Sequence, residues 1–192
     1  MSLITISDIE LRYSTTIVGT STEELYTYLI DAVQEKAEAI CNRNFDETEY
    51  TERLDGNGQF DLLLPEYPVV SVDSIQTVDT DGSVTDTFLS TDYVIDNVNG
   101  SIFYKYGFPK GRYNIKVVYT AGYGTESGSY AVPEDLKETL LQMIEQTKTT
   151  IIKSSDLKSE SLGDYSYTKN NISEIKASET QIFTLKFYMK ID

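Results

Sequence analysis

The residue types that most often carry out enzyme chemistry are scarce in this 192-residue chain. It has no histidine and a single cysteine, Cys41, although it carries 31 aspartates and glutamates. Zinc sites are built mainly from cysteine and histidine, so we expect no zinc site. One cysteine cannot form an internal disulfide, and its isolation suits a reducing compartment. Chance pairs of carboxylates are inevitable at this frequency, so we assign none of them to acid–base catalysis.

One stretch has the spacing of a calcium-binding loop but lacks two of the ligands. Asp79, Asp81 and Gly82 fall at the offsets of such a loop. Its first and last positions would be Thr77 and Phe88, where calcium loops carry carboxylates. We therefore expect no calcium site and no other bound metal.

A pair of glycines has the start of a dinucleotide-binding fingerprint. Gly122 and Gly124 follow a predicted strand, but the third glycine position holds Ser127 and the next helix begins too late. We interpret both as turn glycines and expect no cofactor. Because the chain supplies no base, nucleophile or metal, we do not expect an enzyme.

The composition excludes further classes of protein. Hydrophobic residues make up 40% of the chain, and no run approaches the ~20 apolar residues that a membrane span requires. Residues 1–5 lack the features of a signal peptide. The formal net charge of −15 argues against sequence-independent DNA binding, which relies on lysine and arginine. The acidity fits either simple solubility or a wall past which DNA slides without sticking.

Helices are expected near the N-terminus of the chain. A short one is expected at residues 7–13, and a longer one at about residues 21–43, where Ser21 and Glu24 have the spacing of a capping box. Its apolar stripe comprises Leu25, Leu29, Ala32, Val33, Ala37 and Ile40. Cys41 lies beside this stripe, so we expect it to be a buried core residue.

From about residue 48 to residue 121 the apolar period changes from helical to two, which is typical of strands. Turn residues at 55–58, 79–82 and 97–100 predict hairpins between short strands. A final strand at residues 113–120 places Tyr113, Ile115, Val117 and Tyr119 on one face. The spacing predicts an antiparallel β-meander or small barrel.

A second long helix is expected at about residues 132–150. Pro133 suits the first helical position, and Glu134 and Asp135 follow it at the positive end of the helix dipole. The buried stripe is expected to comprise Leu136, Leu140, Met143, Ile144, Thr147 and Ile151. The predicted class is α+β, with a core at residues 1–152 whose helices flank the β-meander.

Residues 153–192 form an expected C-terminal tail. Its start, residues 153–160, is rich in serine and charge like a linker, and residues 162–167 form an aromatic island. A last helical pattern spans residues 178–189. An isolated helix this short is marginal in water, so it needs a surface to dock on. That surface could be a partner or the chain's own core.

Four stretches together resemble the head–tail connector proteins, also called adaptor or head-completion proteins, of long-tailed double-stranded DNA bacteriophages and prophages. Residues 39–45 (AICNRNF) resemble the end of that family's first long helix, and residues 51–58 (TERLDGNG) with 63–72 (LLPEYPVVSV) resemble its first hairpin. Residues 118–124 (VYTAGYG) through 132–136 (VPEDL) resemble its strand-to-helix junction. Residues 158–167 (KSESLGDYSY) resemble its docking tail.

The resemblance implies a structural virion protein. Such a protein forms a ring, twelvefold like the portal, that binds beneath the portal, extends the DNA channel, helps to retain the genome and joins the tail. Its implied partners are further copies of itself, the portal protein, and a stopper or tail-completion protein. Double-stranded DNA would pass through the channel without sequence-specific binding, and no membrane is involved. The implied location is the head–tail interface of the virion, with host cytoplasm during assembly.

The predicted docking residues for the portal or a neighbouring subunit lie in the tail. They are Gly163, Asp164, Tyr165, Ser166, Tyr167, Ile182, Leu185 and Met189. The two tyrosines would be anchors, because tyrosine buries a large area and keeps a polar tip.

A non-viral β-rich module that binds proteins or carbohydrates is the alternative interpretation. The missing signal peptide argues against it, and so does the absence of tryptophan, because sugar-binding platforms favour aromatic faces.

Overall fold

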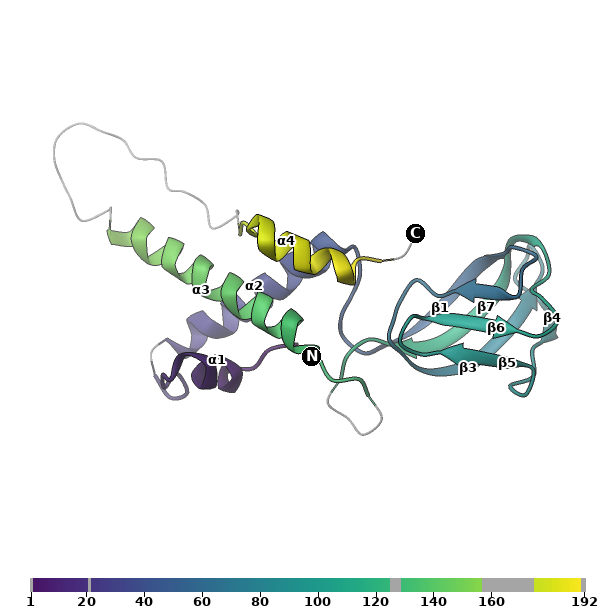
Figure 1. The fold of residues 1–192 in the computed structure, drawn as a ribbon, viewed down its shortest axis with the longest axis horizontal. Helices are drawn as coiled ribbons and strands as arrows, with labels where there is room; N and C mark the ends of the chain where they lie inside the picture. Colours follow the sequence, from purple (N-terminus) through teal and green to yellow (C-terminus); the bar gives the residue numbers. More distant parts are fainter. Residues whose placement is uncertain (1, 21, 125–128, 157–174, 191–192) are drawn as a thin grey trace, which may run out of the picture. The chain divides into compact units, whose positions relative to one another are not determined.

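The computed structural model describes residues 2–20, 22–124, 129–156 and 175–190. The chain divides into two compact units (Figure 1). The helical unit comprises Ser2–Asn42 and Pro133–Met189, and the β unit is mainly the continuous segment Arg43–Val132. The chain therefore starts in the helical unit, builds the strands of the β unit, returns to the helical unit and joins the β unit again at Lys190.

The β unit contains two antiparallel sheets. Its strands are β1 (Thr48–Gly56), β2 (Asp61–Leu63), β3 (Val69–Val78), β4 (Val84–Thr87), β5 (Tyr93–Asp96), β6 (Ser101–Tyr104) and β7 (Gly111–Ala121). The four-stranded sheet has the order β1-β7-β3-β4, and the three-stranded sheet has the order β2-β6-β5. The predicted α+β class with antiparallel strands is therefore confirmed. The described strands form two separate sheets, not a closed barrel, and the first strand pairs with the last, unlike in a meander.

The core of the β unit is built around β7. Ile115, Val117, Tyr119 and Ala121 are buried, as period-two alternation along a strand requires. They pack with Leu62 and other buried residues contributed by the three-stranded sheet. Tyr113, which was expected on the same face, is exposed instead and has a φ of +50°. The regular pairing of β1 with β7 is interrupted at this point, so the alternation does not extend to Tyr113.

Two of the predicted hairpins are confirmed and one is wrong. β3 pairs with β4 across the turn after Val78, and β5 pairs with β6 across residues 97–100. The predicted hairpin at residues 55–58 does not form, because β1 pairs with β7 whereas β2 pairs with β6 in the other sheet. The turn residues bend the chain as expected, but they carry it from one sheet to the other.

Side-chain hydrogen bonds from Asn114 fix the end of β1. Its Oδ1 atom accepts from the backbone N–H of Gly56 at 2.8 Å, and its Nδ2 atom donates to the carbonyl oxygen of Pro109 at 2.9 Å. The backbones of Gly56 and Pro109 approach so closely that a Cβ at Gly56 would collide with the Pro109 carbonyl oxygen. Position 56 requires glycine because the two backbones are so close. Position 58 favours glycine for another reason, because Gly58 has a φ of +75°, which other residues rarely adopt.

The helical unit contains α1 (Ile6–Tyr13), α2 (Glu23–Cys41), α3 (Glu134–Asp156), α4 (Glu179–Leu185) and the 3₁₀ helix η1 (Lys186–Tyr188). The predicted helices are present, and α3 continues into the stretch expected to be a linker. The predicted capping residue Ser21 lies outside the described residues, and α2 begins after Thr22, which makes no side-chain capping bond.

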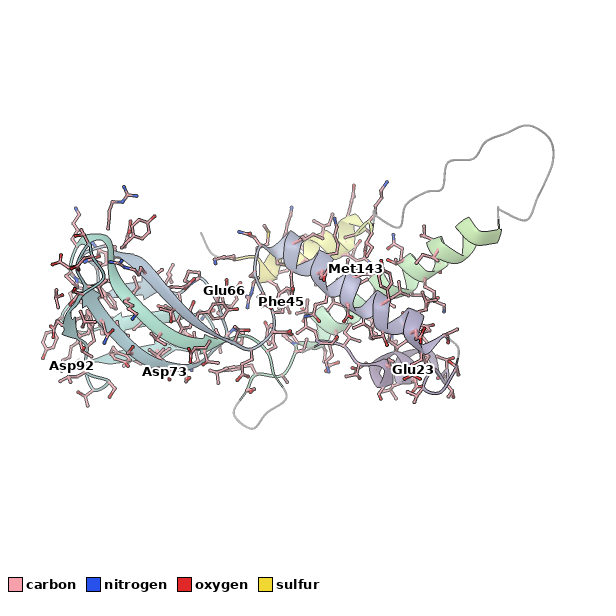
Figure 2. The ribbon with its side chains drawn as sticks, turned by 180° about the vertical axis from the view of Figure 1, so that it is seen from behind. Glu23, Phe45, Glu66, Asp73, Asp92 and Met143 are labelled. Carbon is pink, nitrogen blue, oxygen red and sulfur yellow. The ribbon has the colours of Figure 1, made fainter. Side chains whose placement is uncertain are left out.

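The buried faces of α2 and α3 largely match the predicted stripes, and the two helices pack on each other. On α2, Leu29, Val33 and Ala37 are buried, but Tyr26 replaces Leu25 in the buried face. On α3, the buried residues include Leu136, Leu140, Met143 and Ile144. Figure 2 marks Glu23 and Met143 on the two helices.

An ion pair joins α1 to α3. Arg12 donates to the carboxylate of Glu138 through Nε at 2.9 Å and Nη2 at 2.8 Å. The hydrogen bonds from Arg12, followed by one from Gln142, lower the pKa of Glu138 to about 2. Both charged side chains are more than a third exposed, so solvent screening keeps the contribution of this pair to stability small.

Replacing Gly56 with alanine should destabilise the β unit by about 2–3 kcal/mol, because the new methyl group would force the Pro109 backbone to move. Gly58→Ala is the matched control two residues away. Its Cβ would make only an ordinary contact with Lys110, so it should cost about 1 kcal/mol through its positive φ. Urea unfolding followed by circular dichroism of the sheet measures both. Equal costs would contradict the close approach of Gly56 to Pro109.

Candidate interaction surfaces

The last helix packs on its own unit. Ser178 caps α4 by accepting from the N–H of Gln181, whose side chain accepts from the N–H of Ser178. Leu185 is fully buried, and α4 contacts both α2 and α3. The Sγ atom of Cys41, which is buried as predicted, donates to the carbonyl oxygen of Leu185 at 3.3 Å. The surface on which the described part of the tail docks is therefore its own helical unit.

The structure describes only three of the predicted docking residues. Gly163, Asp164, Tyr165, Ser166 and Tyr167 lie outside the described residues. The other three lie on or just after α4: Leu185 faces inward, Ile182 is half-buried and Met189 is exposed. A docking role for these residues remains a prediction.

Two aromatic side chains next to them are much more exposed. Phe183 and Phe187 are 63% and 69% exposed, and their rings meet edge to face with centroids 5.2 Å apart. They are four residues apart, which brings side chains together on one helix face. Lys186 is also exposed and lies three residues after Phe183. We call Phe183, Lys186 and Phe187 the α4 patch. The spacing of the two phenylalanines was a sequence signal, but an apolar pair is normally assigned to the core.

The outer face of the three-stranded sheet is also apolar. Asp61, Phe103 and Val94 are opposite one another on β2, β6 and β5, so their side chains share one face. The neighbouring row, which includes Leu62 and Ile102, is buried. Together with Phe60 and Leu63, the outer row forms what we call the sheet patch.

The sheet patch is exposed in the described structure. Phe60 and Phe103 are 52% and 47% exposed, and their rings stack with centroids 6.1 Å apart. Val94 and Leu63 are more than half exposed. Large exposed apolar patches mark interaction sites, so the sheet patch is a candidate for one.

A buried polar network lies elsewhere in the β unit. The Tyr119 hydroxyl donates to Oε2 of Glu52 at 2.5 Å and accepts from the backbone N–H of Glu66 at 3.3 Å. Burial, followed by the bond to Glu52, raises the pKa of Tyr119 far above its ordinary value. Figure 2 shows Glu66 and Asp92 at opposite ends of the β unit.

Charged side chains surround Glu66. Lys190 Nζ lies 2.9 Å from its Oε1 atom, and Arg43 Nε lies 3.8 Å from its Oε2 atom. The Arg43 guanidinium also lies over the ring of Tyr67, 4.1 Å from the centroid, and donates to the Tyr67 carbonyl oxygen. These contacts hold the segment between β2 and β3 in place and compensate its buried charge. This network contains no nucleophile next to a base, so it does not have the arrangement of a catalytic site.

Metal-binding and membrane-spanning features are also absent from the part of the chain that the structure describes. No group of three metal-ligating side chains is found among these residues. No helix within the described ranges is long and apolar enough to cross a membrane. A surface hollow beside α2 is lined by Glu23, Glu24 and Asp31 together with threonines and a tyrosine, and it holds no nucleophile–base pair.

A family model described as "Head completion protein" matches residues 2–173. The chain belongs to the head completion protein family. This membership confirms the resemblance to bacteriophage head–tail connector proteins, and it identifies the chain as a structural virion protein rather than an enzyme. No curated protein sequence matches the chain significantly.

Solved structures from gene transfer agent (GTA) particles are similar to this head completion protein. The neck of an empty GTA particle computed with C6 symmetry matches with a TM-score of 0.56 and 14% identity, covering 99% of this chain and 91% of that chain. The virion of a native GTA particle matches with a TM-score of 0.54 and 15% identity, covering 99% of this chain and 91% of that chain. The neck of a native GTA particle computed with C12 symmetry matches with a TM-score of 0.52 and 14% identity, covering 93% of each chain. These identities show a shared fold.

Replacing Leu185 with alanine should lower the free energy of unfolding of the helical unit by about 2–5 kcal/mol, because it would leave a cavity beside Cys41. Phe183→Ala, on the exposed side of the same helix, should change it by less than about 0.5 kcal/mol. Thermal unfolding followed by helical circular dichroism compares the two. A similar small effect for both variants would show that α4 is not packed on its own unit.

Proposed function

We propose that this head completion protein forms a ring at the head–tail interface of a virion. The ring would bind beneath the portal, extend the DNA channel, help to retain the genome and join the tail. The observation that carries the proposal is the family match over residues 2–173, which includes most of both units but ends before α4. No match supports the alternative of a non-viral protein- or carbohydrate-binding module.

The similar structures support the ring and its symmetry. They are parts of GTA necks that were computed with C6 or C12 symmetry, and the likeness extends over nearly the whole of this chain. A ring of twelve copies agrees with both symmetries, since a twelvefold ring also has sixfold symmetry. Copies would meet through heterologous contacts, because those close into rings.

The charge of the chain suits a passage for DNA. At −15 per copy, the ring would repel phosphates, so DNA could slide past without sequence-specific binding. The same charge opposes association of free subunits in the host cytoplasm until a template offsets it. The portal would be that template, and a stopper or tail-completion protein would bind the opposite side of the ring.

The tail would supply contacts to the portal. Tyr165 and Tyr167 would anchor residues 163–167, with Gly163 permitting the turn that presents them. Ile182 and Met189 would contact the portal or a neighbouring copy, while Leu185 seats α4 on its own unit.

Electron microscopy of purified virions should locate this chain as a closed ring between portal and tail. Twelvefold averaging of the neck, with the chain identified by a small tag inserted after Asp192, gives its position and copy number. Virions that carry the same tag on a capsid protein are the control, because their tag density should appear on the capsid and not in the neck. A single copy in the neck, or absence of the chain from virions, would contradict the proposal.

A further inference from the structure

The proposed ring sets a requirement on the surface of each copy. A heterologous ring contact joins two different patches, one from each neighbour, whereas a patch that meets its own counterpart produces only pairs. Each copy must therefore carry two complementary surfaces. The identity of these two surfaces matters only if the ring of the proposed function forms.

The sheet patch and the α4 patch match in chemistry. Each presents two phenylalanine rings already in contact with each other, Phe60 with Phe103 and Phe183 with Phe187. Aromatic rings in contact keep few alternative conformations, so little conformational freedom is lost when such a surface binds. The two patches lie in different units of the fold.

Each patch carries an exposed charge, and these two charges are of opposite sign, although Glu179 is also exposed one turn before Phe183 on α4. Asp61 lies in the same row as Phe103 on the sheet patch, and Lys186 lies next to Phe187 on the α4 patch. Both side chains are exposed, and among the described residues neither forms an ion pair. An acidic group at the edge of one apolar surface and a basic group at the edge of the other favour one pairing and one orientation.

We propose that the α4 patch of one copy docks on the sheet patch of the neighbouring copy. Phe183 and Phe187 pack against Phe60 and Phe103, and Lys186 lies beside Asp61. The helix end of each subunit thereby covers the apolar sheet face of the next. The contact repeats around the ring because each copy uses both of its patches once.

The two patches would supply only the centre of the interface between copies. Half-exposed phenylalanines contribute on the order of 100 Å² each to a contact. Two rings on each side make the centre of an interface whose usual size is about 800 Å² per partner. Polar residues around both patches would form the rim, as in other protein interfaces.

Cysteine cross-linking tests the contact directly. One chain carries Phe103→Cys and a second carries Phe187→Cys, and the two are mixed and assembled into rings on the portal. The native Cys41 is buried and does not compete. Oxidation with copper phenanthroline should produce a disulfide-linked dimer from the mixture and from neither variant alone. Mixing two singly substituted chains ensures that any such bond joins different copies.

The control replaces Phe103→Cys with Val84→Cys, a position on β4 in the other sheet with a similar exposure of 50%. It should cross-link to Phe187→Cys at least about tenfold less. A closed ring without the 103–187 bond would overturn this inference and leave the proposed function intact. Cross-linking of Phe103→Cys with itself would also overturn it, because sheet patches would then meet each other. If no ring forms on the portal or in virions, the proposed function itself fails.

Charge reversal provides a second test if the cysteine variants assemble poorly. Asp61→Lys or Lys186→Asp alone should reduce ring yield about two- to fivefold, the range expected for one exposed ion pair. Combining the two reversals in one chain should restore the yield. Additive losses in the double variant would show that the two residues do not meet.

Discussion

The buried row of β7 is the interaction on which the β unit depends. Ile115, Val117 and Tyr119 have no exposed surface, and β7 pairs with β1 on one side and β3 on the other. A change in this row would disturb two strand pairings at once. Tyr119 also brings a hydroxyl into the core, and its bonds to Glu52 and the Glu66 backbone remove the cost of burying it. Once this strand is in place, the three-stranded sheet can bury its inner row and leave its outer row exposed.

The local structure was largely predictable from sequence, but the strand partners were not. Apolar periods of two and of about 3.6 residues depend only on near neighbours, so they located the long helices and the strand expected at residues 113–120, which lies within β7 (Gly111–Ala121). The pairing of β1 with β7 joins Leu54 to Ile115, far along the chain. A flexible turn such as residues 55–58 shows that the chain reverses, but it does not show which strand will be the partner. The side-chain hydrogen bonds of Asn114 fix the end of β1, but they form only when the chain is folded, so the sequence does not reveal the partner strand through them.

The candidate surfaces were predicted only in part, for a reason specific to α4. The expected stripe of Ile182, Leu185 and Met189 assumes one continuous helix, but α4 ends at Leu185 and η1 continues it with fewer residues per turn. The three residues therefore do not all lie on one face, so Leu185 is buried and Met189 is exposed. Phe183 and Phe187 lie outside the expected stripe, so the sequence pattern did not single them out. Their exposure depends on which face of α4 the rest of the unit covers, and sequence alone does not give this.

Particles made without the chain test most directly the proposal that it completes the head and joins it to the tail. A stop codon early in its gene, with the full chain supplied from a second copy, separates loss of the protein from other damage. Heads produced without the chain should package DNA but remain tailless and lose their genome, and the supplied chain should restore tailed, DNA-filled virions. Tailed particles that retain DNA in the absence of the chain would contradict the claim.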